Sequence, residues 1–207
     1  MKKNKTVFSV VILLLLLAIT GMQTLSAMDI MQSFQKANSK TTDEGIQGRK
    51  TLIIYYSRSG HTREAAKKIQ AQTGGDLLEI ETAAPYPREY ADVVQQAKQE
   101  IEADYKPEIK TKVENIASYD VVFIGSPIWW GTIAPPVASF LAKNDLAGKT
   151  VVPFVTHAGS GLAQSVGDIK KLAPAAKVLD GLAIEGSKVN EANEKITSWL
   201  SRLQVSE

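Results

Sequence analysis

After Lys50 the chain alternates between two hydrophobic patterns. Short runs that are apolar at nearly every position predict buried strands, because a strand inside a parallel sheet is covered on both faces. Longer segments with apolar residues three and four positions apart predict helices with one buried stripe. The runs that predict strands are residues 51–56, 76–81, 121–125, 151–155 and 178–184. The helical patterns occupy residues 63–72, 90–105, 135–141, 166–172 and 190–203.

Strands that alternate with helices predict an α/β fold whose parallel strands are joined by right-handed crossovers. We therefore expect a three-layer, doubly wound, five-stranded parallel sheet with the strand order 2-1-3-4-5. Pro153 interrupts the fourth strand run and predicts a bulge or an unpaired position there, because proline has no N–H. In such a sheet, ligands bind at the carboxyl ends of the strands, beside the point where the strand order reverses.

The N-terminal residues have a different pattern. Three lysines precede an apolar run at residues 7–19, and Ser26 and Ala27 follow it. This order predicts a signal peptide over residues 1–27, and hence an exported, extracytoplasmic protein. The alternative is an uncleaved N-terminal anchor, because residues 6–28 carry no charge. Residues 28–48 are polar and predict a flexible linker to a domain at residues 49–207.

The composition narrows the possible functions. Lysine and arginine total 24 against 22 acidic residues, and removing residues 1–27, which hold three lysines and no acid, leaves 21 against 22. This near-neutral balance gives no basis for nucleic-acid binding. The absence of cysteine excludes disulfides, thiolate metal ligands and a cysteine nucleophile. With only His61 and His157 in the chain, we expect no multi-histidine metal centre.

The loop after the first strand run, S-R-S-G-H-T at residues 57–62, has the composition of a phosphate-binding loop. It precedes a helix, whose first backbone N–H groups and positive dipole end favour an anion. Ser57, Ser59 and Thr62 add hydroxyl donors, and Gly60 allows a close approach of the backbone. The alternative is an ordinary capped turn between a strand and a helix.

Two further segments are expected beside this loop: residues 126–132, S-P-I-W-W-G-T, and residues 156–161, T-H-A-G-S-G. Trp129 and Trp130 are adjacent and cannot both enter one core face, so one is expected to face solvent or to stack on a ligand. Alternatively, one packs under the loop and the other rests on a neighbouring helix. The glycines of the later segment offer N–H groups that could contact the edge of a planar ligand.

Together these three segments resemble the flavodoxin family, and most closely its bacterial branch with P-I-W-W-G and T-H-x-G-S-G loops. The resemblance covers residues 50–203 and implies a domain that binds FMN noncovalently. The residues implied to hold the phosphate are Ser57, Arg58, Ser59, Gly60, His61 and Thr62. Those implied to cover one side of the isoalloxazine are Pro127, Ile128, Trp129, Trp130 and Gly131. Those implied to line its other edge are Thr156, His157, Ala158, Gly159 and Ser160.

The resemblance implies an FMN protein that exchanges electrons with a redox partner protein or a small quinone-like acceptor, and the predicted signal peptide would export it. One alternative is an NAD(P)H-dependent quinone or flavin reductase, although the chain has no separate nicotinamide-binding motif. Another is a flavin-free scaffold that uses the same loops to bind a partner. No nucleic-acid partner is expected, and contact with a membrane is expected only through an uncleaved N-terminal segment.

Overall fold

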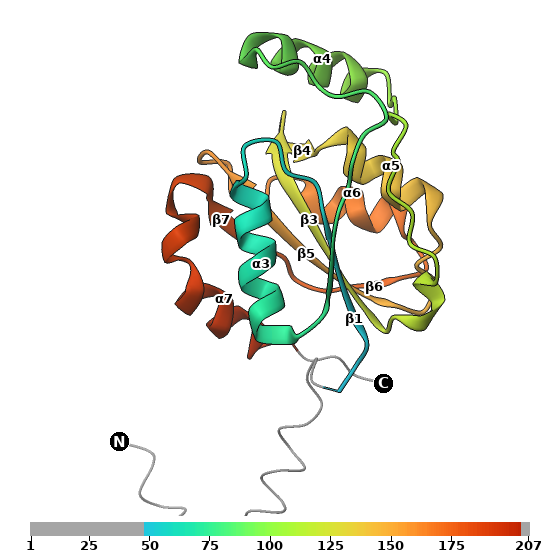
Figure 1. The fold of residues 1–207 in the computed structure, drawn as a ribbon, viewed down its shortest axis with the longest axis vertical. Helices are drawn as coiled ribbons and strands as arrows, with labels where there is room; N and C mark the ends of the chain where they lie inside the picture. The colour runs from blue at the N-terminus through green and yellow to red at the C-terminus, as the bar shows by residue number, and fades with distance from the viewer. Residues whose placement is uncertain (1–47, 204–207) are drawn as a thin grey trace, which may run out of the picture. The chain divides into compact units, whose positions relative to one another are not determined.

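The computed structural model describes residues 48–203, which form one sheet with helices around it (Figure 1). The predicted signal peptide and nearly all of the predicted linker lie outside these residues. The strands are β1 (Thr51–Tyr55), β2 (Asp76–Glu79), β3 (Val121–Trp129), β4 (Thr132–Ile133), β5 (Thr150–His157), β6 (Lys177–Val178) and β7 (Leu182–Glu185). The α-helices are α3 (His61–Thr73), α4 (Tyr90–Glu102), α5 (Pro135–Lys143), α6 (Ser165–Leu172) and α7 (Asn193–Leu200). Two 3₁₀ helices are η1 (Ile116–Ser118) and η2 (Gly186–Glu191).

The sheet confirms the predicted doubly wound α/β fold. Its main path runs β2-β1-β3-β5-β6, and every neighbouring pair along it is parallel. In the numbering of the observed strands this path reads 2-1-3-5-6 rather than 2-1-3-4-5, because the described sheet has seven strands and not the expected five. β4 is a short additional strand that pairs antiparallel with β3, and the position predicted for one fifth strand is shared by β6 and β7.

Pro153 explains why the outer strand is divided. β6 pairs with β5 at Thr150 and Val151, whereas β7 pairs with it only from Phe154 onward. The gap between β6 and β7 therefore faces the proline, which has no N–H for a neighbouring strand. This arrangement agrees with the prediction of an unpaired position in the fourth strand run.

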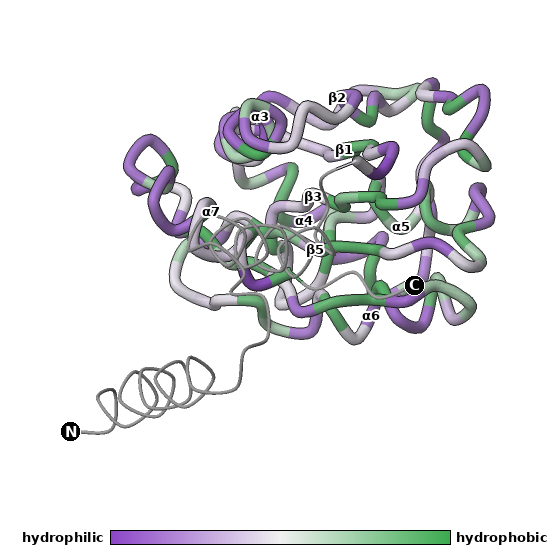
Figure 2. The backbone as a smooth tube through the Cα atoms, turned by 90° about the horizontal axis from the view of Figure 1, so that it is seen from below, coloured by the Kyte–Doolittle hydropathy of each residue, from purple (hydrophilic) through white to green (hydrophobic). Residues whose placement is uncertain are grey.

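Two apolar cores lie on opposite faces of the sheet because successive strand residues point to opposite sides. Ile53 and Phe123 pack on one face with residues of α3 and α7, whereas Ile54 and Ile124 pack on the other with residues of α5 and α6. In Figure 2 the tube is green along β1, β3 and β5, and more polar along β2, which lies at the sheet edge. The central strands are thus buried on both faces, as their sequence predicts.

The chain between β2 and β3, residues 80–119, departs from the layered plan. Its helix α4 covers neither face of the sheet and lies beyond the end where β3 meets β4 (Figure 1). The residues between α4 and η1 form no regular helix or strand, and Ile109 forms an isolated antiparallel bridge with Thr82. Ile109 and Val113 pack into the second core, where a regular crossover would place a helix. We call residues 80–119 the β2–β3 connection.

Two other boundaries differ from the predictions. The third strand continues to Trp129, so the segment expected to be a loop is largely strand. The predicted helix at 190–203 is shorter, because η2 occupies its beginning and α7 ends at Leu200. Its predicted apolar face is nevertheless correct, since Ile196 and Trp199 are buried in the first core. Within residues 48–203, no helix combines the length and apolar character needed to cross a bilayer.

Candidate functional site

The phosphate loop, residues 57–62, joins β1 to α3 at the carboxyl edge of the sheet. Gly60 precedes the helix with φ of 92°, a left-handed conformation that glycine adopts readily, and no side chain caps the helix. The first N–H groups of α3 therefore lack a side-chain acceptor. The buried Oγ of Ser57 also has no hydrogen-bond partner, and it is the single such side-chain atom in the described part of the chain.

Buried hydroxyls connect the first and third loops. The Oγ1 atoms of Thr62 and Thr156 lie 2.8 Å apart, and both residues are buried. His61 lies against Gly186, where any added Cβ would overlap its ring. The phosphate loop is consequently held against β5 and η2, whereas Ser59 and His61 are exposed.

Arg58 is directed toward the β2–β3 connection. It donates a hydrogen bond of 2.9 Å to the backbone oxygen of Arg88, and its guanidinium lies 5.6 Å from the ring centroid of Tyr90. Arg63 is also engaged, because it forms two hydrogen bonds with the Glu79 carboxylate, at 2.6 and 2.8 Å. The donors left at the loop are therefore chiefly hydroxyl and backbone N–H groups.

The second loop is a hairpin rather than the expected irregular segment. Trp129 of β3 pairs with Thr132 of β4, and the turn between them consists of Trp130 and Gly131, with φ of 50° and 81°. Two successive positive φ values are the signature of a type I′ turn, which matches the twist of a two-stranded hairpin. Pro127 and Ile128 lie within β3, so a strand, and not a mobile loop, supports this part of the site.

The two tryptophans have different environments. The half-buried Trp129 makes edge-on contacts with Tyr56 and Tyr86, at centroid distances of 5.6 and 5.1 Å. Trp130 is 56% exposed, and its Nε1 donates a hydrogen bond of 3.0 Å to the backbone oxygen of Val94 in α4. This is the alternative in which one indole packs under the loop and the other rests on a helix.

The third loop follows β5 and is open. Thr156 is buried, whereas Ala158, Gly159 and Ser160 are exposed. The Gly159 N–H donates a hydrogen bond of 2.9 Å to His157 Nδ1 and closes a tight turn, in which Gly159 has φ of 124°. A Cβ added at Gly159 would meet nothing within 4 Å, so space remains above this turn.

A cavity of 410 Å³ lies where the first two loops meet α4. Arg58 and Ser59 line it from the phosphate loop, and residues 127–130 line it from the second loop. The third loop does not contribute to its wall. The sequence reasoning missed the α4 residues that complete the lining, Tyr90, Val93, Val94 and Ala97. Their helical spacing was visible, but it was interpreted as an ordinary buried stripe.

The phenols beside these loops remain protonated at neutral pH. Burial, together with the nearby Glu79 carboxylate, raises the pKa of Tyr55 to about 12. Burial also raises the pKa of Tyr56 well above its ordinary value. Both groups are therefore neutral hydrogen-bonding groups that add no negative charge against an incoming anion.

Comparison with known proteins identifies the family to which this fold and these loops belong. The family model described as flavodoxin matches residues 50–203. A Bacteroides eggerthii protein assigned as a flavoprotein is 35% identical, with a TM-score of 0.62, over 72% of this chain and 99% of its own. A flavoprotein from Lactobacillus acidophilus, solved in complex with FMN, is 28% identical, with a TM-score of 0.57, over 70% of this chain and 98% of its own.

A curated relative, the NAD(P)H dehydrogenase (quinone) of Caulobacter vibrioides, is 27% identical over 121 residues. The match covers 53% of this chain and 57% of the dehydrogenase. The chain therefore spans little more than half the length of this relative.

Proposed function

Because this chain belongs to the flavodoxin family, we propose that it binds FMN noncovalently and transfers electrons. The observation that carries the proposal is the buried, unpartnered hydroxyl of Ser57 beside the uncapped N-terminus of α3. Buried polar groups are normally paired, so an orphaned hydroxyl next to free N–H groups fits an absent anion. The phosphate of FMN supplies that anion and accepts hydrogen bonds from these donors.

The other two loops would hold the isoalloxazine. Residues 127–131 offer a hairpin with apolar side chains, and residues 158–160 of the third loop offer an exposed turn whose backbone can approach the ring edge. FMN, when bound, supplies the redox chemistry, while the protein orients the cofactor and sets its surroundings. No stacking tyrosine occurs in the third loop, so a backbone turn would border the ring on that side.

The visible spectrum of the full chain tests this proposal. After incubation with FMN and removal of free flavin, the protein is expected to be yellow and to show quenched tryptophan fluorescence. A colourless protein with unchanged emission would favour the flavin-free scaffold. Reduction of the bound flavin by a chemical donor and its reoxidation by a quinone would then establish electron transfer.

The NAD(P)H-dependent quinone reductase is the second candidate. It is supported by the quinone dehydrogenase relative and by the 410 Å³ cavity beside residues 127–130, which has room for a flat acceptor. Rapid mixing of the flavin-loaded protein with NADPH or NADH distinguishes the candidates. Fast flavin bleaching identifies the reductase, whereas bleaching only by a protein or chemical donor identifies the carrier.

We also propose that the protein is exported through residues 1–27 and that residues 28–48 tether the domain. The basic and then apolar order of the N-terminal residues supports this proposal. Fractionation of expressing cells, with mass spectrometry of the mature N-terminus, is expected to find the protein outside the cytoplasm and to begin at Met28. An intact N-terminus in the membrane fraction would instead identify an uncleaved anchor.

A further inference from the structure

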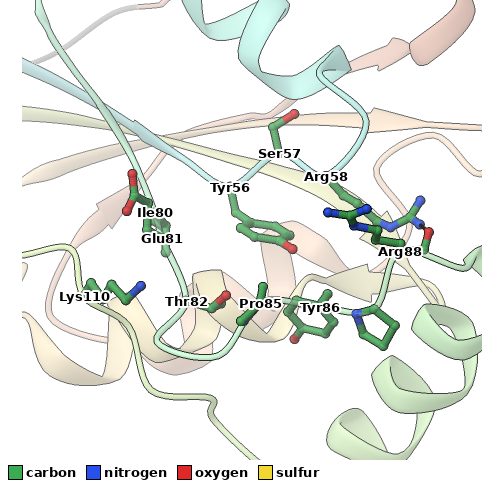
Figure 3. Close-up of a pocket in the computed structure, with 11 residues that line it drawn as sticks. Tyr56, Ser57, Arg58, Ile80, Glu81, Thr82, Pro85, Tyr86, Arg88 and Lys110 are labelled. Carbon is green, nitrogen blue, oxygen red and sulfur yellow. Dashed lines mark hydrogen bonds between the residues drawn. The ribbon is translucent and has the colours of Figure 1, made fainter.

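A second cavity, of 610 Å³, lies where β1 and β2 end, on the side of β1 away from β3 (Figure 3). Its walls come from residues 56–58, from residues 80–82 after β2, and from residues 85–88 and Lys110 of the β2–β3 connection. None of these residues except Ser57 and Arg58 was predicted to belong to a site. We call this space the basic cavity.

Aromatic side chains form the middle of the basic cavity. The rings of Tyr56 and Tyr86 lie 6.0 Å apart at an angle of 54°, with Pro85 beside them (Figure 3). The Tyr86 hydroxyl is occupied, because it donates a hydrogen bond to the buried Glu100 carboxylate. The Tyr56 hydroxyl makes no hydrogen bond within the described residues and faces the same region. Because Tyr56 is buried, the accessible apolar area comes from the exposed Pro85 and the half-buried Tyr86 ring, and Tyr56 contributes mainly its free hydroxyl.

Positive charge gathers at the rim of this cavity. Arg58 and Arg88 line one end, where the Arg58 guanidinium donates a hydrogen bond to the backbone oxygen of Arg88, and Figure 3 shows Lys110 at the other end. In residues 48–203, neither Arg88 nor Lys110 has a carboxylate within the 4.0 Å that defines an ion pair, and Glu81 is the single acidic residue in the lining. Two cationic side chains that line the same end of a cavity repel each other, so an anion bound there would stabilise this end.

We propose that the basic cavity binds the adenosine-phosphate part of a nucleotide. The phosphate would lie between Arg58 and Arg88, where planar guanidinium groups can donate paired hydrogen bonds. The base would lie against Pro85 and the half-buried ring of Tyr86, because aromatic side chains stack readily on nucleobases. An uncharged aromatic ligand would use only the apolar surface of the cavity, and a bare anion would use only its cations.

Arg58 connects this cavity to the proposed flavin site. It lines the basic cavity as well as the 410 Å³ cavity at the second loop. A dinucleotide with its adenylate in the basic cavity would pass Arg58 and extend its second half toward residues 127–130. This connection between the two cavities rests on the second proposed function, the quinone reductase, and it identifies the reductant as NAD(P)H.

Calorimetric titrations of the full chain with saturating FMN test the inference. The ligands are adenosine 2′,5′-bisphosphate, adenosine and inorganic phosphate. The bisphosphate is expected to bind at least about tenfold more tightly than either fragment, because only it uses both the cations and the apolar surface. Arg88→Ala and Lys110→Ala should each weaken its binding by about tenfold, and Arg88→Lys should restore part of the loss.

Lys112→Ala is the matched control, because Lys112 is exposed on the same segment and does not line the cavity. It should leave the bisphosphate affinity unchanged. Equal affinity for the bisphosphate and adenosine, or insensitivity to both Arg88→Ala and Lys110→Ala, would overturn the inference. If the protein is yellow but does not bind the bisphosphate, the proposed FMN function stands and the nucleotide inference is refuted. If the protein is colourless but its bisphosphate binding depends on Arg88, the nucleotide inference stands and the proposed FMN function is refuted.

Discussion

Residues 50–79 and the β2–β3 connection both border the site, but they fold by different means. The first region is a regular β1–α3–β2 unit whose core residues Ile53, Ala65 and Ile69 are fully buried. The second contains α4, the short η1 and otherwise chain with almost no regular secondary structure, and it carries Tyr90 and Tyr105, which are 72% and 57% exposed. The regular region fixes the phosphate loop in place, whereas the irregular one supplies walls of both cavities.

The comparison indicates a division of roles. The donors proposed to bind the phosphate belong to a unit whose core side chains are fully buried. The side chains that would select a second ligand belong to a connection that packs into the second core only at separate points, such as Ile80 and Ile109, and whose helix α4 contacts Arg58 and Trp130 of the loops. Substitutions in the two regions should therefore have separable effects on stability and on ligand binding.

The largest difference should appear when one large side chain is truncated in each region. Ile53 of the regular unit is fully buried in the first core, so Ile53→Ala is expected to cost about 2–5 kcal/mol of unfolding free energy. Tyr90→Ala, at an exposed position of the connection, should cost about 0.5 kcal/mol or less. Urea denaturation measures both, and similar losses would refute the comparison.

A second test separates ligand binding from stability. Ser57→Ala removes a hydroxyl that has no protein partner, so the unfolding free energy of the flavin-free protein should stay within about 0.5 kcal/mol. Its FMN affinity should fall by about 1.5–3 kcal/mol, or roughly 10- to 150-fold, because a hydrogen bond to the charged phosphate is lost. Calorimetry measures the FMN affinity of the variant, and urea denaturation measures its unfolding free energy.

Ser139→Ala is the matched control for this test. The Ser139 hydroxyl is buried and donates a hydrogen bond of 2.7 Å to the backbone oxygen of Pro107 in the connection. Its loss should lower stability by about 1 kcal/mol and leave the FMN affinity unchanged. If Ser57→Ala behaved in the same way, the Ser57 hydroxyl would have a structural role only.

The junction of β1 with β2 should show a pH dependence. The Tyr55 phenol donates a hydrogen bond of 3.1 Å to Glu79, and its pKa rises from 10.0 to about 12 in the folded protein. The folded state thus holds this proton more tightly than the unfolded state, and the stabilisation is complete below pH 10 and disappears as the pH rises through about 12. Between pH 10 and pH 12 the unfolding free energy of the wild type should fall by up to about 2 kcal/mol more than that of Tyr55→Phe. Urea denaturation at these two pH values measures the difference. Parallel pH profiles would contradict this assignment.

The smallest effect concerns the contact between the second loop and α4. Trp130→Phe keeps an aromatic ring but removes the hydrogen bond to Val94, which should cost about 1 kcal/mol or less. Amide hydrogen exchange should become faster in α4 and remain unchanged in β1 and α3. If exchange became faster evenly over the whole molecule, α4 would not open independently of β1 and α3.

Most of the fold could be predicted from the sequence because the strands and helices of the layered part bury continuous apolar patterns. Pro153 even indicated the unpaired position where the outer strand is divided. The place of α4 could not be predicted, because its stripe of Val93 and Ala97 is equally compatible with packing on a sheet face or against a loop. Its position depends on contacts with Arg58 and Trp130, which are distant in the sequence.

The candidate site was predictable to a similar degree. The three loops follow β1, β3 and β5 at one edge of the sheet, so their convergence follows from the strand order. The hairpin geometry of Trp130 and Gly131 was not foreseen, because tryptophan is an unusual residue at a positive φ. The basic cavity was also missed, since Arg88 and Lys110 stand in a segment with no periodic pattern.

The most direct measurement compares the affinity of the full chain for FMN with its affinity for riboflavin, which has the same ring but no phosphate. If the phosphate loop binds an anion, calorimetry should find FMN bound at least about 100-fold more tightly, since several charge-assisted hydrogen bonds are involved. Ser57→Ala should reduce this ratio. Equal affinity for the two flavins, or no binding of either, would contradict the account.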